Sequence, residues 1–184
     1  MNYFNLDNNI IDLDTWKIIV QRERSASYKY YTTNNGTVTD LCASLAYPSE
    51  DCRNNPNDPI NILLKKFNNN LKMPEGKLVT FIKFNKGSGI FPHIDDAIKR
   101  STTFAWAVNL DPIEFSPILF HDPDDKTKIV DRGYYKKEGI VFNTQKIHSV
   151  QPGDKERVSF QISFSNPIEE VYDLYLKGQL FDKN

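Results

Sequence analysis

Two of the three histidines in this chain, His93 and His148, belong to a pattern that suits a metal ion. His93 and Asp95 are two residues apart, so on an extended segment both side chains leave the same face. His148 would complete a set of two imidazole nitrogens and one carboxylate oxygen on one side of the ion. Such a set suits Fe(II) and leaves the opposite face open to other ligands. The sequence therefore predicts an iron site at His93, Asp95 and His148.

Arg157 and Ser159 follow His148 and begin a β-rich run. They are two apart, so on a strand they share a face, and a guanidinium group binds a carboxylate through two parallel hydrogen bonds. An arginine that points into a protein core is costly unless an anion meets it. This pair predicts an anion-binding site next to the metal. The alternative is an ion pair on the strand surface with Asp154 or Glu156.

The elements that must position these residues are mostly strands. From Lys77 onward the chain is rich in β-branched and aromatic residues and is divided by turns. The runs that predict strands are 78–84, 102–110, 118–120, 128–130, 139–142 and 157–164. Several short strands at close spacing predict a sandwich or a barrel.

Helices are predicted on both sides of this β-rich part. Asp58-Pro59 begins a pattern with apolar residues three and four apart, and Asn166-Pro167 begins a second one. The segment Trp16–Val20 fits either a strand or a helix. We expect a single domain over 1–184, with a helical and β support region (1–76), a β core (77–165) and a C-terminal helix (166–184).

The net charge of −1 and the pI of about 6.3 exclude a strong general attraction to nucleic acids, which are therefore unlikely partners. The longest apolar runs are as short as strands, and no signal peptide is visible, so we expect no membrane span. Cys42 and Cys52 form no recognisable pair, and reduced thiols in a cytoplasmic protein are the simplest interpretation.

Between about Lys77 and Phe164 the chain resembles the Fe(II)/2-oxoglutarate-dependent oxygenase superfamily, above all its prolyl and aspartyl/asparaginyl hydroxylase-like members. The matching features are P-H-x-D at 92–95, a β-rich interval, and H-x8-R-x-S from His148 to Ser159. The resemblance implies a mainly β fold with flanking helices, a double-stranded β-helix or jelly roll. It implies that Fe(II) binds His93, Asp95 and His148, and that 2-oxoglutarate chelates the iron while its distal carboxylate meets Arg157 and Ser159. O2 would be the second cosubstrate.

The activity implied by this resemblance is hydroxylation of a C–H bond, with succinate and CO2 as coproducts. We expect a small amino-acid-like substrate first, and a proline, aspartate or asparagine within a peptide second. Arg100 is the leading candidate to bind a substrate carboxylate, and Trp106 and Asn109 are further candidates for the substrate pocket. Asp95 fills the position that related halogenases leave open for halide, so hydroxylation is favoured over halogenation.

The chain departs from the pattern of the superfamily at Phe84, where many members carry a tyrosine that contacts 2-oxoglutarate. A phenyl ring cannot donate a hydrogen bond, so Thr80, Thr103 or Asn109 would have to replace that donor.

Two other functions stay open on the sequence alone: a non-catalytic jelly-roll module that binds a metal or ligand, and a cupin-type metalloenzyme that does not use 2-oxoglutarate. Cupins usually carry H-x-H, which His93-Ile94-Asp95 does not match.

The third histidine, His121, stands beside the acidic turn 122–125, and we expect it on a solvent-facing hairpin. The oligomeric state is not readable from the sequence.

Overall fold

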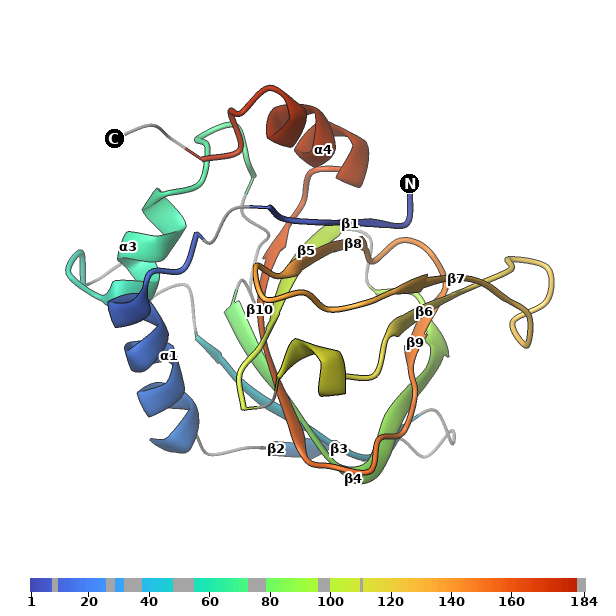
Figure 1. The fold of residues 1–184 in the computed structure, drawn as a ribbon. Coiled ribbons are helices and arrows are strands. Elements are labelled where there is room, and N and C mark those ends of the chain that lie inside the picture. Colours follow the sequence, from blue (N-terminus) through green and yellow to red (C-terminus); the bar gives the residue numbers. More distant parts are fainter. Residues whose placement is uncertain are drawn as a thin grey trace.

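The fold is a curled antiparallel sheet covered by helices (Figure 1). The structure is a computed structural model that describes residues 1–7, 10–25, 29–31, 38–47, 55–72, 79–95, 100–109 and 111–181. The strands are β1 (Tyr3–Asn5), β2 (Lys29–Tyr31), β3 (Val38–Tyr47), β4 (Val79–His93), β5 (Thr102–Ala107), β6 (Ile118–His121), β7 (Ile129–Gly133), β8 (Ile140–Asn143), β9 (His148–Val150) and β10 (Arg157–Phe164). The helices are α1 (Leu13–Ser25), α3 (Pro59–Lys65), α4 (Ile168–Leu176) and the 3-10 turn η1 (Pro112–Glu114).

The strand order is β1-β8-β5-β10-β4-β9-β6-β7, with β3 paired to β4 and β2 paired to β3. The long strand β4 links the two parts of the sheet, because residues 79–84 pair with β10 whereas Ile90 and His93 pair with β9. In Figure 1 the sheet curls into a barrel, α1 and α3 lie along one side, and α4 lies at one end. The predicted support region shares the sheet with the core, since β1 pairs with β8 and β3 pairs with β4.

The alternation of side chains along the strands separates two apolar cores. On β5, Phe104 and Trp106 pack with the helices, whereas Ala105 and Ala107 face a second cluster inside the barrel. The barrel cluster is Ala105, Ala107, Phe115, Ile118, Phe120, Tyr135, Ile140 and Phe142. On β10 the even-numbered residues 158–164 pack on the helix side. Because successive side chains alternate, Arg157 and Ser159 face the barrel interior.

The two N-terminal helices begin at aspartate caps. Asp58 Oδ1 accepts a hydrogen bond from the Ile60 backbone N–H at 2.9 Å, as its position before Pro59 predicts. Asp12 Oδ1 accepts from the Thr15 N–H at 2.7 Å, and its Oδ2 meets Lys66 Nζ at 2.8 Å. The ambiguous segment Trp16–Val20 therefore lies in a helix, α1, which an ion pair joins to the end of α3.

The C-terminal helix α4 starts as predicted just after Pro167, but Asn166 does not cap it. Its Oδ1 instead accepts a hydrogen bond from the Lys72 N–H at 2.6 Å, which ties the end of β10 to the segment after α3. Within the ranges given above, no helix is long and apolar enough to cross a membrane. The predicted boundary near 76 and Cys52 lie outside the described residues.

Candidate metal centre and anion pocket

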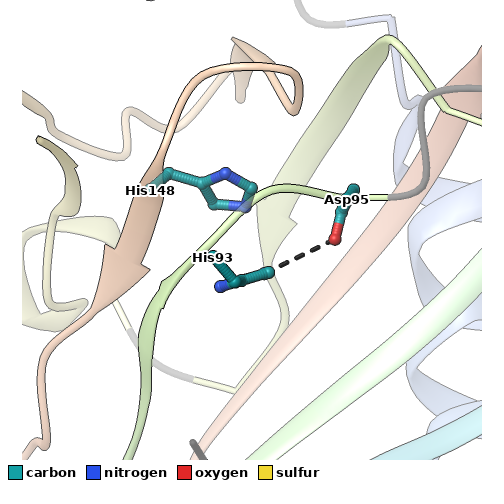
Figure 2. Close-up of side chains that lie close together, drawn as sticks. All are labelled: His93, Asp95 and His148. Carbon is teal, nitrogen blue, oxygen red and sulfur yellow. Dashed lines mark ion pairs between the residues drawn. The ribbon is translucent and has the colours of Figure 1, made fainter. Parts of the chain in front are cut away.

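The three predicted metal ligands meet at one end of the β4–β9 pair (Figure 2). His93, the last residue of β4, lies directly opposite His148, the first residue of β9, and their ring centroids are 4.4 Å apart. Asp95 follows two residues after His93, and its Oδ1 is 3.4 Å from His93 Nε2. One ligand atom from each of the three residues lies within 4.8 Å of the others. The strand register therefore brings the predicted set together.

Backbone carbonyls fix both imidazoles in a form that can bind a metal. His93 Nδ1 is 2.9 Å from the Phe91 carbonyl oxygen, and His148 Nδ1 is 2.9 Å from the Lys146 carbonyl oxygen. A carbonyl oxygen only accepts, so each Nδ1 carries the hydrogen and donates it. In the neutral ring each Nε2 then keeps its lone pair, the arrangement usual for metal-bound histidine. Two such nitrogens and one carboxylate fit Fe(II).

The electrostatics of the site favour the ligand forms of Asp95 and His148. Burial and the neighbouring His93 lower the pKa of His148 to about 4, so this ring is neutral at physiological pH. Burial alone would raise the pKa of Asp95, but the nearby His93, His148 and Arg100 outweigh it and lower that pKa. Burial lowers the pKa of His93, yet its contact with Asp95 prevails and the net shift is upward. The side chains of His93 and Asp95 are 30% and 25% exposed, so the site is open to solvent on their side.

The turn between β8 and β9 holds Asp95 in place. The Asp95 backbone N–H donates to the Thr144 carbonyl at 3.0 Å. The Gln145 side-chain amide donates to the carbonyls of Asp95 at 3.3 Å and Arg100 at 2.7 Å. One side chain therefore bridges the carboxylate ligand and the predicted substrate-binding arginine.

Arg157 is a buried cation without a carboxylate partner in the described part of the chain. It is 1% exposed, and its Nη2 donates to the carbonyls of Ser88 at 2.7 Å and Gln151 at 3.1 Å. Its Nε and Nη1 find no hydrogen-bond partner among the described residues. Two unsatisfied donors on a buried charge are expensive, so an anion that accepts from them fits this pocket.

The surface ion pair that the sequence left open for Arg157 does not form among the described residues. Glu156 Oε2 pairs with Lys83 Nζ at 2.8 Å instead. Asp154 influences Arg157 only as a nearby charge. Ser159, the other predicted anion ligand, is fully buried on the same face of β10 as Arg157.

Tyr135, which the sequence analysis did not single out, reaches the same pocket. Its hydroxyl is 3.4 Å from Ser159 Oγ, and its ring packs against Phe115 with centroids 4.8 Å apart. Burial raises the pKa of Tyr135, although Ser159 and Arg157 act in the opposite direction. The missed signal is the alternation of β7, which continues past Gly133 and leaves Tyr134 exposed and Tyr135 buried.

Two of the predicted substrate contacts lie away from the metal ligands. Trp106 packs with the helices, and its Nε1 donates to the Glu138 carbonyl at 2.8 Å. The Asn109 amide donates to the Glu156 carbonyl at 3.1 Å and accepts from the Val158 N–H at 2.7 Å. Both line a cavity of about 560 Å³ beside α1 and η1, and no metal ligand lines it. Their substrate roles stay predictions that their positions do not favour.

Thr103 and His121 have side-chain partners of their own. Thr103 Oγ1 is 3.0 Å from Ser163 Oγ, and Thr80 lies opposite Gln161. Both threonines are therefore farther from Arg157 along the strands than Ser159 is. His121 is buried, not solvent-facing as expected, with its Nε2 2.7 Å from Ser149 Oγ. An irregularity in the β6–β7 pairing between Phe120 and His121 accompanies this difference.

Solved structures with the same fold are known. An oxidoreductase of the 2OG-Fe(II) oxygenase family from Burkholderia pseudomallei matches with a TM-score of 0.61 at 14% identity, over 89% of this chain and 85% of its own. A prolyl hydroxylase from Trichoplax adhaerens, in complex with a peptide fragment of the hypoxia inducible factor oxygen degradation domain, matches at 0.57 and 13% identity over 89% and 83%. The epimerase SnoN, in complex with Fe3+, alpha ketoglutarate and nogalamycin RO, matches at 0.57 and 12% identity over 89% and 78%.

No protein-family model matches the sequence, and no curated protein does. At identities this low the structural likeness shows the fold alone. The chain has the double-stranded β-helix fold of the 2-oxoglutarate/Fe(II) oxygenases, which confirms the predicted fold class and, at the level of the fold, the predicted resemblance.

Proposed function

We propose that this protein is an Fe(II)- and 2-oxoglutarate-dependent dioxygenase that hydroxylates a C–H bond. The observation that supports the proposal most strongly is the convergence of His93, Asp95 and His148 within a barrel whose interior also receives a buried, incompletely partnered arginine, Arg157. The ring of Phe142, a member of the barrel cluster, packs edge-on against His148 at 5.6 Å, so the metal ligands adjoin that interior.

In this proposal each residue has a defined role. His93, His148 and Asp95 hold Fe(II), and Arg157 with Ser159 binds the distal carboxylate of 2-oxoglutarate. When bound, the iron supplies the oxidising chemistry, in which R–H, 2-oxoglutarate and O2 give R–OH, succinate and CO2. The barrel side chains around His148 exclude bulk water from one side of the site, while the exposed side of His93 and Asp95 admits the substrate.

The residues around the open side favour a small substrate with a carboxylate and an apolar part. Arg100 is held beside Asp95 by Gln145 and offers a cation for the carboxylate. Phe91 stands two residues before His93, so it shares the face of His93 on β4, and it is 48% exposed and offers apolar contact. An amino-acid-like molecule fits this combination best, and a peptidyl proline, aspartate or asparagine second. The solved complex of a prolyl hydroxylase with a peptide supports the second class.

An anaerobic titration tests the cofactor assignment. Fe(II) followed by 2-oxoglutarate should produce a visible charge-transfer band, and air with a suitable substrate should then release one succinate for each product. A panel of amino acids and short peptides that contain proline, aspartate or asparagine identifies the substrate class. Arg100→Gln should raise KM for a carboxylate-bearing substrate about tenfold or more, as expected for loss of one charged hydrogen bond. An unchanged KM would refute the role of Arg100.

The same titration separates the alternatives. A non-catalytic module would bind metal without succinate release under any substrate. A cupin-type enzyme would turn over without 2-oxoglutarate. Either result would overturn the proposal. The proposed chemistry requires ferrous iron and thus fits a reducing compartment such as the cytoplasm. We also propose that residues 1–184 act as one domain.

A further inference from the structure

The anion pocket has more hydrogen-bond donors than the sequence pattern assigns to it. Arg157 brings Nε and Nη1, neither of which has a partner among the described residues. Ser159 brings a hydroxyl on the same face of β10. Tyr135 brings a phenol from the segment between β7 and β8, 3.4 Å from Ser159 Oγ. Three side chains from two segments therefore offer donors here, and one of them, Arg157, carries a buried positive charge.

Phe84 occupies this pocket but cannot supply a donor. It lies directly opposite Arg157 in the β4–β10 register, and the guanidinium carbon is 4.9 Å from the centre of its ring. A ring in that place stabilises the cation through its face and fixes one side of the guanidinium group. The hydrogen bond that a tyrosine there would donate has to come from another residue.

We propose that Tyr135 supplies this donor, and that its hydroxyl binds the distal carboxylate of 2-oxoglutarate together with Arg157 and Ser159. This inference rests on the proposed function and adds a cosubstrate-binding residue to it. The ring of Phe84 then packs against the guanidinium group, and the hydroxyl of Tyr135 donates the hydrogen bond.

The surroundings of Tyr135 suit this role. Its ring is held by Phe115, so the position of the hydroxyl oxygen is set before the cosubstrate arrives. Its contact with Ser159 is long for an O–H···O hydrogen bond, whose usual length is about 2.7–2.8 Å. Both hydroxyls can therefore turn to a stronger, charged acceptor at little cost. Because burial raises the pKa of Tyr135, its phenol stays protonated and able to donate.

The test compares two ligands on the Zn(II)-loaded protein by isothermal titration calorimetry. 2-Oxoglutarate carries the distal carboxylate, whereas 2-oxobutyrate keeps the 2-oxo acid group and lacks that carboxylate. Tyr135→Phe should weaken 2-oxoglutarate binding about tenfold or more, as expected for one hydrogen bond to a charged group. It should leave 2-oxobutyrate binding unchanged. The neighbouring Tyr134→Phe, at a site 57% exposed, is the matched control and should change neither affinity.

The other outcomes are distinct. Wild-type affinity of Tyr135→Phe for 2-oxoglutarate, or an equal loss for both acids, would overturn the assignment. Binding of neither acid by the wild-type protein would refute the proposed function and the assignment with it. The substitution keeps the ring and removes only the long contact with Ser159, so Tm should stay close to that of the wild type, and this is measured alongside.

Discussion

His93 and His148 face each other across the β4–β9 pair, at the point where the first strand ends and the second begins. Residues directly opposite in an antiparallel pair send their side chains to the same face, and the two rings lie 4.4 Å apart at 49°. A β-strand irregularity between Ile90 and His93 sets this register. The candidate metal centre thus depends on strand pairing for its two nitrogens and on a short extension of β4 for its oxygen.

Asp95→Ala should remove the only carboxylate in the ligand set. Loss of an outer partner of a metal ligand already costs about 10–100-fold in metal affinity, so loss of the ligand itself should cost at least about 100-fold. Fe(II) affinity measured anaerobically should fall accordingly, and succinate formation should cease. Asp173→Ala, at an exposed carboxylate on α4, is the control and should alter neither quantity. Retention of wild-type iron affinity by Asp95→Ala would exclude this residue as a ligand.

Arg157→Met should separate cosubstrate binding from stability. Methionine has similar length and no charge, and replacement of a buried, poorly partnered charge by an apolar side chain is often neutral. Removal of the buried charge favours folding, whereas loss of the hydrogen bonds to Ser88 and Gln151 opposes it. The free energy of unfolding should therefore change by less than about 2 kcal/mol.

In the same variant, 2-oxoglutarate affinity should fall about 100-fold or more, because a carboxylate loses a bidentate cationic partner. Iron affinity should stay at the wild-type level, since Arg157 is not among the proposed metal ligands. Chemical denaturation, calorimetry with 2-oxoglutarate and iron titration measure the three quantities. An unchanged affinity for 2-oxoglutarate would show that the distal carboxylate binds elsewhere.

The sequence was sufficient to predict that His93 and Asp95 share a face, because a two-residue spacing fixes the face of an extended segment. The position of His148 beside them depends on the pairing of β4 with β9. The sequence was sufficient for β5 as a strand and for α3 with its Asp58 cap, because these signals are local. It could not settle which face of β5 looks toward the site. That choice depends on which side the helices cover, and they cover the side of Trp106.

Tyr135 shows a different limit of the sequence. Its alternation with Tyr134 continues a strand period, yet nothing local indicates that it meets Ser159, which is 24 positions away in the chain. The approach of Tyr135 to Ser159 requires the sheet to curl, so that the inner face of β10 is turned toward the segment between β7 and β8. Asn109 was a candidate for substrate contact by its position on the predicted strand 102–110, but the structure gives its side chain two backbone partners, Glu156 just before β10 and Val158 on it.

Asn109→Ala should therefore act through Arg157. The Asn109 amide holds the backbone on both sides of Arg157, at Glu156 and Val158, so its loss should release the start of β10. We expect a loss of stability of about 1–2 kcal/mol and a rise in KM for 2-oxoglutarate, with KM for the substrate unchanged. Asn69→Ala, at an exposed site, is the control. A rise in KM for the substrate alone would support the direct contact that the sequence suggested.

Gln145→Ala should weaken the metal centre without removal of a ligand. The Gln145 amide holds the carbonyls of Asp95 and Arg100, and the adjacent Thr144 carbonyl accepts from the Asp95 N–H. Without the amide, Asp95 has one anchor fewer and spends less time in the geometry that binds iron, so Fe(II) affinity should fall about 10–100-fold. Gln145→Glu removes the same donor but adds a charge near the site, so the two variants separate lost anchoring from added charge. Gln179→Ala, at an exposed glutamine, should retain wild-type affinity. If Gln145→Ala also kept wild-type affinity, the backbone bond from Asp95 to Thr144 would be sufficient to position the carboxylate.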